Sequence, residues 1–102
     1  MIAAQLNLLC AAYQNVDRVG LATADPGPTG ANDSGITKRT LSWSTPAAGN
    51  MTAVATFPSI TGIFTHITLW DGSVFIEAIP NAINVAGTPS DVTVAVEHTV
   101  DA

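Results

Sequence analysis

The sequence predicts a mainly β protein, an antiparallel β-sandwich with one N-terminal α-helix. A single stripe of apolar residues at helical spacing opens the chain, and several segments that alternate apolar and polar residues follow it. Clusters of Gly, Pro, Asn and Asp separate those segments. At 102 residues the chain has the length of one domain. We therefore predict a single domain over residues 1–102, with the helix at about residues 2–17 and the sandwich at about residues 19–101.

The predicted helix rests on apolar residues three or four positions apart. The stripe consists of Ile2, Leu6, Leu9, Tyr13 and Val16. Asn and Gln between them leave the opposite face polar, so the helix is amphipathic. We expect its apolar side to pack on the sheets.

Segments at residues 19–23, 37–45, 51–57 and 92–100 are predicted strands, since side chains alternate between two faces along a strand. Residues 24–35 separate the first two and contain turn-forming residues with almost no bulk to bury. A loop of this length in a compact domain is often functional or mobile. Pro80 is expected to end a later strand and to begin a second long connection, with a short strand at residues 83–86.

A β-hairpin is predicted at residues 62–79, because Asp71-Gly72 is a preferred turn pair between two runs of β-branched and aromatic residues. If those two residues form the whole loop, the cross-strand pairs follow directly. One face would carry Leu69–Val74, Ile67–Ile76 and Thr65–Ala78, and the other Thr68–Phe75, His66–Glu77 and Phe64–Ile79. The first face is nearly apolar and the second is mixed, so both would need cover.

The composition is poor in charge. Charged residues make up 11% of the chain, and the net charge is −5 with three basic residues, whereas ordinary domains contain about 25% charged residues. So few basic residues argue against nucleic-acid binding, which requires Lys and Arg at the phosphates. No apolar run is long enough for a membrane span. The scarcity of charge suits either a surface covered by other subunits or a plain soluble monomer.

No catalytic motif is present, so the chain is predicted not to be an enzyme, and we expect no cofactor. His66 and Glu77 could form an acid–base pair, but a simple cross-strand pair explains them better. Asp25 and Asp33, with Asn32 in the same loop, offer oxygen ligands of the kind calcium prefers, but they lack the spacing of a known site and we predict no metal. Trp43, Trp70 and Phe75 could stack on sugars, although packing explains them more simply; Cys10 and His98 are expected to be structural.

Three segments carry a resemblance to a known group of proteins. They are residues 24–33, ADPGPTGAND, residues 38–43, KRTLSW, and residues 65–71, THITLWD. In this order they resemble a widespread family of small tailed-bacteriophage virion proteins. The resemblance covers about residues 5–80, and the ADPGPTGAN segment is its most specific part. Asp33 stands where the family usually has Glu, and the Asp71-Gly72 loop is shorter than in many members.

The resemblance implies a virion structural protein made in the host bacterial cytoplasm. A capsid head decoration protein, bound to the outer capsid surface and stabilising the shell, fits a chain without stalk or trimerisation segment best. The alternatives are a minor tail or tail-fibre protein with a carbohydrate or receptor-binding role, and a head-to-tail connector component. The implied partners are the major capsid protein and other copies of the chain, in a homo-oligomer expected to be a trimer, with no nucleic acid and no membrane.

Two sets of residues are predicted to make these contacts. The capsid-binding set consists of Asp25, Pro26, Gly27, Thr29, Asn32 and Asp33, in a loop expected to become ordered on binding. The self-association set consists of Phe64, Phe75 and Ile79, the apolar residues of the second hairpin face.

Overall fold

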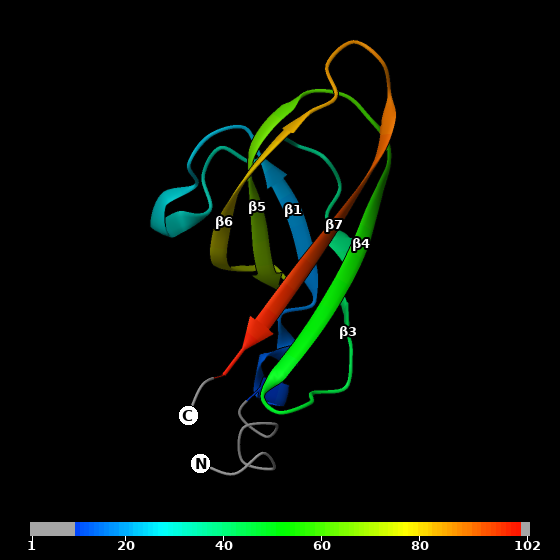
Figure 1. Ribbon diagram of the computed structural model, residues 1–102. Coiled ribbons are helices and arrows are strands. Elements are labelled where there is room, and N and C mark those ends of the chain that lie inside the picture. The colour runs from blue at the N-terminus through cyan, green and yellow to red at the C-terminus, as the bar shows by residue number, and fades with distance from the viewer. Residues whose placement is uncertain (1–9, 101–102) are drawn as a thin grey trace.

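The computed structural model describes residues 10–100, which form two antiparallel sheets packed face to face (Figure 1). The predicted mainly β sandwich is therefore confirmed. The strands are β1 (Arg18–Ala22), β2 (Arg39–Thr40), β3 (Ser42–Trp43), β4 (Asn50–Ile60), β5 (Ile63–Asp71), β6 (Val74–Asn84) and β7 (Ser90–Thr99), and two 3-10 turns are η1 (Tyr13–Asn15) and η2 (Gly27–Thr29). One sheet has the order β2-β1-β5-β6 and the other has the order β3-β4-β7.

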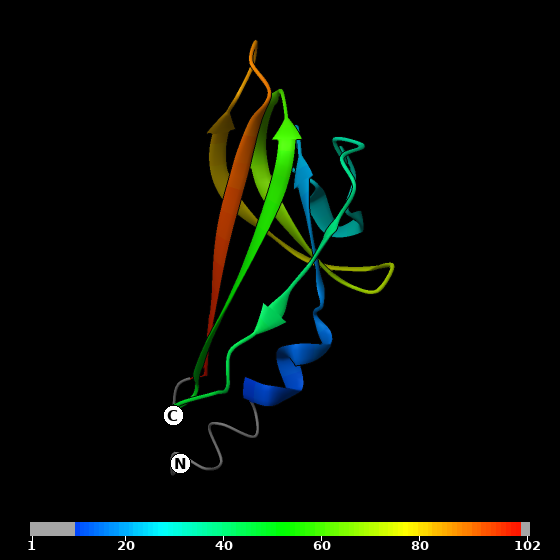
Figure 2. The same ribbon diagram turned by 90° about the vertical axis from the view of Figure 1, so that its right-hand side faces the viewer.

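The helical segment lies at the end of the sandwich where β7 finishes (Figures 1 and 2). Residues 10–12 are helical and continue into η1, and the backbone is extended at Val16. The helix therefore ends slightly before the predicted residue 17, and the first part of the prediction, residues 2–9, lies outside the described residues. Cys10 is fully buried, as predicted, and its thiol lies 3.8 Å from the carbonyl oxygen of His98.

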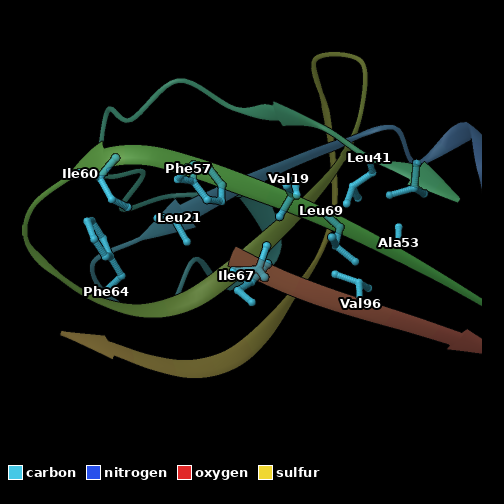
Figure 3. Close-up of a cluster of buried hydrophobic side chains, with 13 residues drawn as sticks. Val19, Leu21, Leu41, Ala53, Phe57, Ile60, Phe64, Ile67, Leu69 and Val96 are labelled. Carbon is cyan, nitrogen blue, oxygen red and sulfur yellow. The ribbon is translucent and has the colours of Figure 1, made fainter. Parts of the chain in front are cut away.

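The core fills the space between the two sheets (Figure 3). Along β4 the alternation is as predicted: Met51, Ala53, Ala55 and Phe57 are buried and the residues between them are exposed. Val94 and Val96 of β7 face them from the same sheet. Val19, Leu21, Ile67 and Leu69 close the core from the four-stranded sheet.

The predicted strand at residues 37–45 is divided between the two sheets. β2 pairs with β1, and after Leu41 the chain joins the other sheet, where β3 pairs with β4 (Figure 2). Leu41 is buried at the crossing, and its amide donates a hydrogen bond to the carbonyl oxygen of Asp17. Strands that change sheets in this way form the corners of a sandwich, and the side-chain alternation alone could not reveal the change.

The predicted hairpin exists, but its predicted register is wrong. Gly72 and Ser73 form the turn, Asp71 pairs with Val74, and Trp70 pairs with Phe75. An irregularity follows, after which Leu69 pairs with Glu77 and Ile67 with Ile79. The amide of Gly72 donates to the carboxylate of Asp17 at 3.0 Å, a contact with a distant segment that helps to place the turn one residue later.

β6 continues beyond the expected end of the hairpin. Pro80 lies inside β6, opposite His66, and does not close the strand. Because β6 is an edge strand, a residue without an amide hydrogen is tolerated there. The separate short strand predicted at residues 83–86 is instead the end of β6, which reaches Asn84.

Candidate partner-binding surface

The loop between β1 and β2 folds back onto the four-stranded sheet. Its backbone is tied to β1 at two points, because the amide of Thr23 donates to the carbonyl of Asn32 and the amide of Ser34 donates to the carbonyl of Leu21. Ala22 and Asp33 also form an isolated antiparallel bridge. The two ends of the loop are thus paired with each other next to the end of β1.

Side chains within the loop stabilise its turns. The Asp25 carboxylate accepts a hydrogen bond from the amide of Gly27, and the Asn32 side chain donates to the carbonyl of Asp25, both at 2.9 Å. The Asp33 carboxylate accepts from the amide of Gly35 at the same distance. Such bonds are the usual role of Asn and Asp in turns. The loop is organised by its own contacts, whereas the sequence predicted a segment that becomes ordered only on binding.

Lys38 connects this loop to the aromatic pair of the hairpin. Its ammonium lies 3.1 Å from the Asp33 carboxylate and 4.2 Å from the centre of the Trp70 ring. The Trp70 indole in turn donates to the hydroxyl of Thr68 at 2.8 Å, and Thr68 is buried. Gly20 lies beneath these side chains, where a β-carbon would approach the Thr68 hydroxyl to 2.8 Å.

Trp70 and Phe75 form the floor on which η2 rests. Their ring centroids are 5.3 Å apart in an edge-to-face arrangement. Gly30 follows η2 in the left-handed conformation, and a β-carbon there would lie 2.9 Å from Phe75 and 3.0 Å from Trp70. Only glycine meets both demands without strain. The close approach at Gly30 brings the loop and the hairpin together.

The structure separates the predicted capsid-binding residues into exposed and supporting ones. Thr29 is exposed, and so are Gly27, Asp25 and Asp33. Pro26 is fully buried, so it can only support the loop and cannot touch a partner. Asn32 is exposed, but its amide is already used within the loop.

The three predicted self-association residues do not share a surface. Phe64 is 3% exposed and belongs to the core, so the expectation that it lies on an outer hairpin face is wrong. Ile79 is half-buried and packs against the core. Phe75 alone lies beside the loop, half-buried against Gly30 and Trp70.

Sequence reasoning missed Lys38 and Gly30 as parts of this surface. Lys38 falls within the predicted strand at residues 37–45, and nothing in the sequence indicates that its side chain covers Trp70. The signal for Gly30 was its place in the segment that carries the family resemblance. The close contact at Gly30 depends on a hairpin far along the chain, since Trp70 lies 40 positions after Gly30.

The acid–base pair suggested by the sequence does not form. His66 lies opposite Pro80 and shares a 2.7 Å hydrogen bond with the Thr65 hydroxyl, whereas Glu77 lies opposite Leu69. Among residues 10–100, no group of three potential ligands is placed to hold a metal ion. Asp25 and Asp33 are instead engaged in the turn and lysine contacts described above.

A second aromatic cluster lies beside the helical segment and includes Tyr13 of η1. The Tyr13 ring stacks on His98, with centroids 3.9 Å apart, and meets Trp43 edge-on. The Trp43 indole donates to the carbonyl of Val16 at 2.7 Å. The Tyr13 hydroxyl is buried and has no hydrogen-bond partner in the described part of the chain. Burial first, and then the nearby carboxylate of Glu77, raise the pKa of the Tyr13 phenol.

The aromatic side chains that could have stacked on a sugar are therefore engaged with protein. Lys38 lies over the Trp70 ring, Gly30 approaches its far edge, and Trp43 is held between Tyr13 and Val16. These contacts favour packing over an open stacking platform.

Comparison with known proteins found no matching family model, no matching curated protein and no matching solved structure. No helix in the described residues is long and apolar enough to cross a membrane.

Proposed function

We propose that this protein is a bacteriophage virion structural protein, a head decoration protein that binds the outer surface of the capsid and stabilises the shell. The observation that carries the proposal is the contact between Gly30 and the Trp70–Phe75 pair. It joins two of the three segments on which the family resemblance rests, residues 24–33 and 65–71. Two segments that are far apart in the sequence, and that each resemble the family, therefore lie in contact in the structure.

The exposed part of that feature is the proposed capsid contact. Thr29 is exposed and its side chain makes no described hydrogen bond, so it is free to meet a partner. Since the loop is already organised, binding would not require much further ordering, which reduces its entropic cost. Several copies in a trimer would then strengthen weak single contacts, because each bound copy raises the effective concentration of the others.

The low charge of the chain supports a role in an assembly. Interface cores are depleted in charged residues, and this chain contains only 11%. Val74, at the tip of the hairpin, is 61% exposed, and Ile63 is 58% exposed. The hairpin tip projects away from the three-stranded sheet (Figure 2). These apolar positions are available for contacts with the major capsid protein or with another copy.

Copy number in purified virions tests the proposed location. On the order of tens to hundreds of copies on the head are expected for a decoration protein, since it would repeat with the capsid lattice. Roughly three to twelve copies on the tail would contradict the proposal. That result would favour a minor tail or tail-fibre protein, or a head-to-tail connector component.

A pair of variants tests the proposed surface. Thr29→Arg places a long charged side chain on the loop and should abolish binding to capsids that lack the protein, while the fold is retained. Thr88→Arg makes the same change on the exposed β6–β7 connection and serves as the control. Equal binding of the two variants in a capsid co-sedimentation assay would show that the loop is not part of the capsid contact.

A further inference from the structure

A groove runs along the side of the sandwich where the chain crosses between the sheets. Residues 36–40 form one wall and residues 54–60 of β4 form the other. Two adjoining cavities of about 380 and 220 Å³ make up the groove, and Arg39 lines both. The larger cavity lies between residues 38–40 and 54–56, and the smaller one is lined by Ile36 and Ile60 among others.

One wall of this groove is an open strand edge. β7 pairs with β4 along one side, but β3 pairs with the other side only at Ala53 and Val54. Past Val54, no strand within residues 10–100 pairs with β4 on that side. On the same side of β4 as β3, the Thr52 carbonyl accepts a hydrogen bond from the Ser44 amide. Because backbone groups alternate along an antiparallel strand, the amide and carbonyl of Thr56 point the same way, into the groove.

The groove also contains the basic residue with no partner in the described structure. Arg18 lies 3.3 Å from Asp17, and Lys38 pairs with Asp33, whereas the guanidinium of Arg39 makes no ion pair or hydrogen bond with any residue in the range 10–100. Arg39 pairs with Val19, whose side chain is in the core. Directly opposed residues project to the same side of a sheet, so the Arg39 side chain leaves β2 toward β4.

We propose that this groove is a docking site for an extended peptide segment that carries an aspartate or glutamate. The segment would add a short strand to the open edge of β4, with hydrogen bonds to the backbone of Thr56. Its carboxylate would meet the guanidinium of Arg39, which is suited to binding a carboxylate through two parallel hydrogen bonds. Half-buried Ile36, in the smaller cavity, would contact an apolar side chain of the segment, and buried Phe57 would support the groove from below.

Two features restrict what can bind. Pro58 has no amide hydrogen, so pairing is limited to a few residues and the affinity is expected to be weak. A basic segment would bring its charge against Arg39, which is unfavourable. The chain as a whole is acidic, with eight acidic and three basic residues. The groove, which contains Arg39, is therefore a basic site on an acidic protein. The proposed peptide-binding site is independent of the proposed role in the virion, because it is argued from the groove alone.

The test uses the full chain labelled with nitrogen-15 and a capped pentapeptide, Thr-Val-Glu-Val-Thr, as the probe. We expect shifts of the Thr56 and Arg39 amide resonances, slower exchange of the Thr56 amide, and a Kd on the order of 1 mM. Replacing the probe's Glu with Gln, or making Arg39→Gln, should weaken binding roughly 10-fold, since each removes a charge-assisted hydrogen bond. Arg18→Gln is the matched control and should leave binding unchanged.

Three results would overturn the proposal. The first is the absence of shifts along residues 54–58 at a probe concentration of about 5 mM, several times the expected Kd. The second is equal binding by a peptide with Lys in place of Glu. The third is unchanged binding by Arg39→Gln, provided that its core amide shifts match those of the parent chain. Because the Arg39 side chain is exposed and its guanidinium makes no described hydrogen bond or ion pair, that variant is expected to fold normally.

Discussion

Gly30 shows how one residue without a side chain can position a surface. Its φ of +76° is disfavoured for other residues, and the space where a β-carbon would lie is occupied by Phe75 and Trp70. Gly35 has a similar φ of +82°, but nothing lies within 4 Å of the corresponding position. Substitution of Gly35 would therefore incur only the cost of the backbone conformation, whereas substitution of Gly30 would also incur the cost of a steric clash.

We predict that Gly30→Ala destabilises the protein more than Gly35→Ala. Both changes incur the backbone cost, about 1 kcal/mol, and only Gly30→Ala adds overpacking of about 1–3 kcal/mol. Urea unfolding followed by tryptophan fluorescence measures the difference, because Trp70 is in the contact. Equal losses of stability would show that the loop does not rest on the aromatic pair.

The Tyr13 phenol predicts a pH dependence of stability. Its pKa is raised in the folded protein by burial and by Glu77, above the value of about 10 for an unfolded chain. The folded state therefore holds this proton more tightly. The stabilising contribution is complete below about pH 10 and is lost as the pH rises above that value, where the unfolded chain ionises first.

Replacing Tyr13 with Phe should remove this alkaline loss. At neutral pH the change should alter stability by about 1 kcal/mol or less, because the buried hydroxyl makes no geometrically defined hydrogen bond within residues 10–100, although the Glu77 carboxylate lies nearby. Urea unfolding at neutral and alkaline pH measures both effects. Tyr13 is the single tyrosine of the chain, so ultraviolet absorbance reports its ionisation directly, and ionisation near the ordinary value would contradict the burial argument.

At the level of elements, the β5–β6 hairpin shows the limit of reasoning from turn residues. Asp71-Gly72 correctly indicated a hairpin, but Gly72-Ser73 forms the turn and an irregularity follows Trp70. The shift places Glu77 opposite Leu69 and moves Ile79 opposite Ile67. Cross-strand pairs derived from the turn were consequently wrong, even where the strands themselves were identified.

Neighbouring residues of β5 test the corrected placement. Phe64→Ala should cost about 3–5 kcal/mol through a cavity in the core, whereas Ile63→Ala, at an exposed position, should change stability by about 0.5 kcal/mol or less. Thermal or urea unfolding measures both. If Phe64→Ala instead changed the oligomeric state with little loss of stability, Phe64 would lie in an interface and not in the core.

At the scale of the whole molecule, the two sheets differ in how their edges are protected. β2 and β3 cover one side with two residues each, whereas β6 and β7 are long edge strands. Open edges expose backbone groups that can pair with another chain. β6 contains Pro80, which interrupts such pairing, but β7 contains no proline.

Amide hydrogen exchange should reveal this difference. In the isolated protomer we expect the slowest exchange in β5, which is paired on both sides, and fast exchange at alternate residues of β7, whose outward amides meet solvent. In an assembled particle, new protection confined to β7 would identify that edge as a subunit contact. Uniformly fast exchange in β5 would contradict the observed strand order.

The sequence by itself determined the fold class, most of the strands and the alternation that divides β4 and β7 into buried and exposed faces. These features depend on local periodicity and turn chemistry, which short segments contain. The sequence also identified residues 24–33 and 65–71 as segments of interest. Only the tertiary structure decided that they touch, that Leu41 carries the chain from one sheet to the other, and that Phe64 is buried. Each of these depends on packing between segments far apart in the chain, where contacts with Asp17, Gly30 or Trp70 outweigh the local pattern.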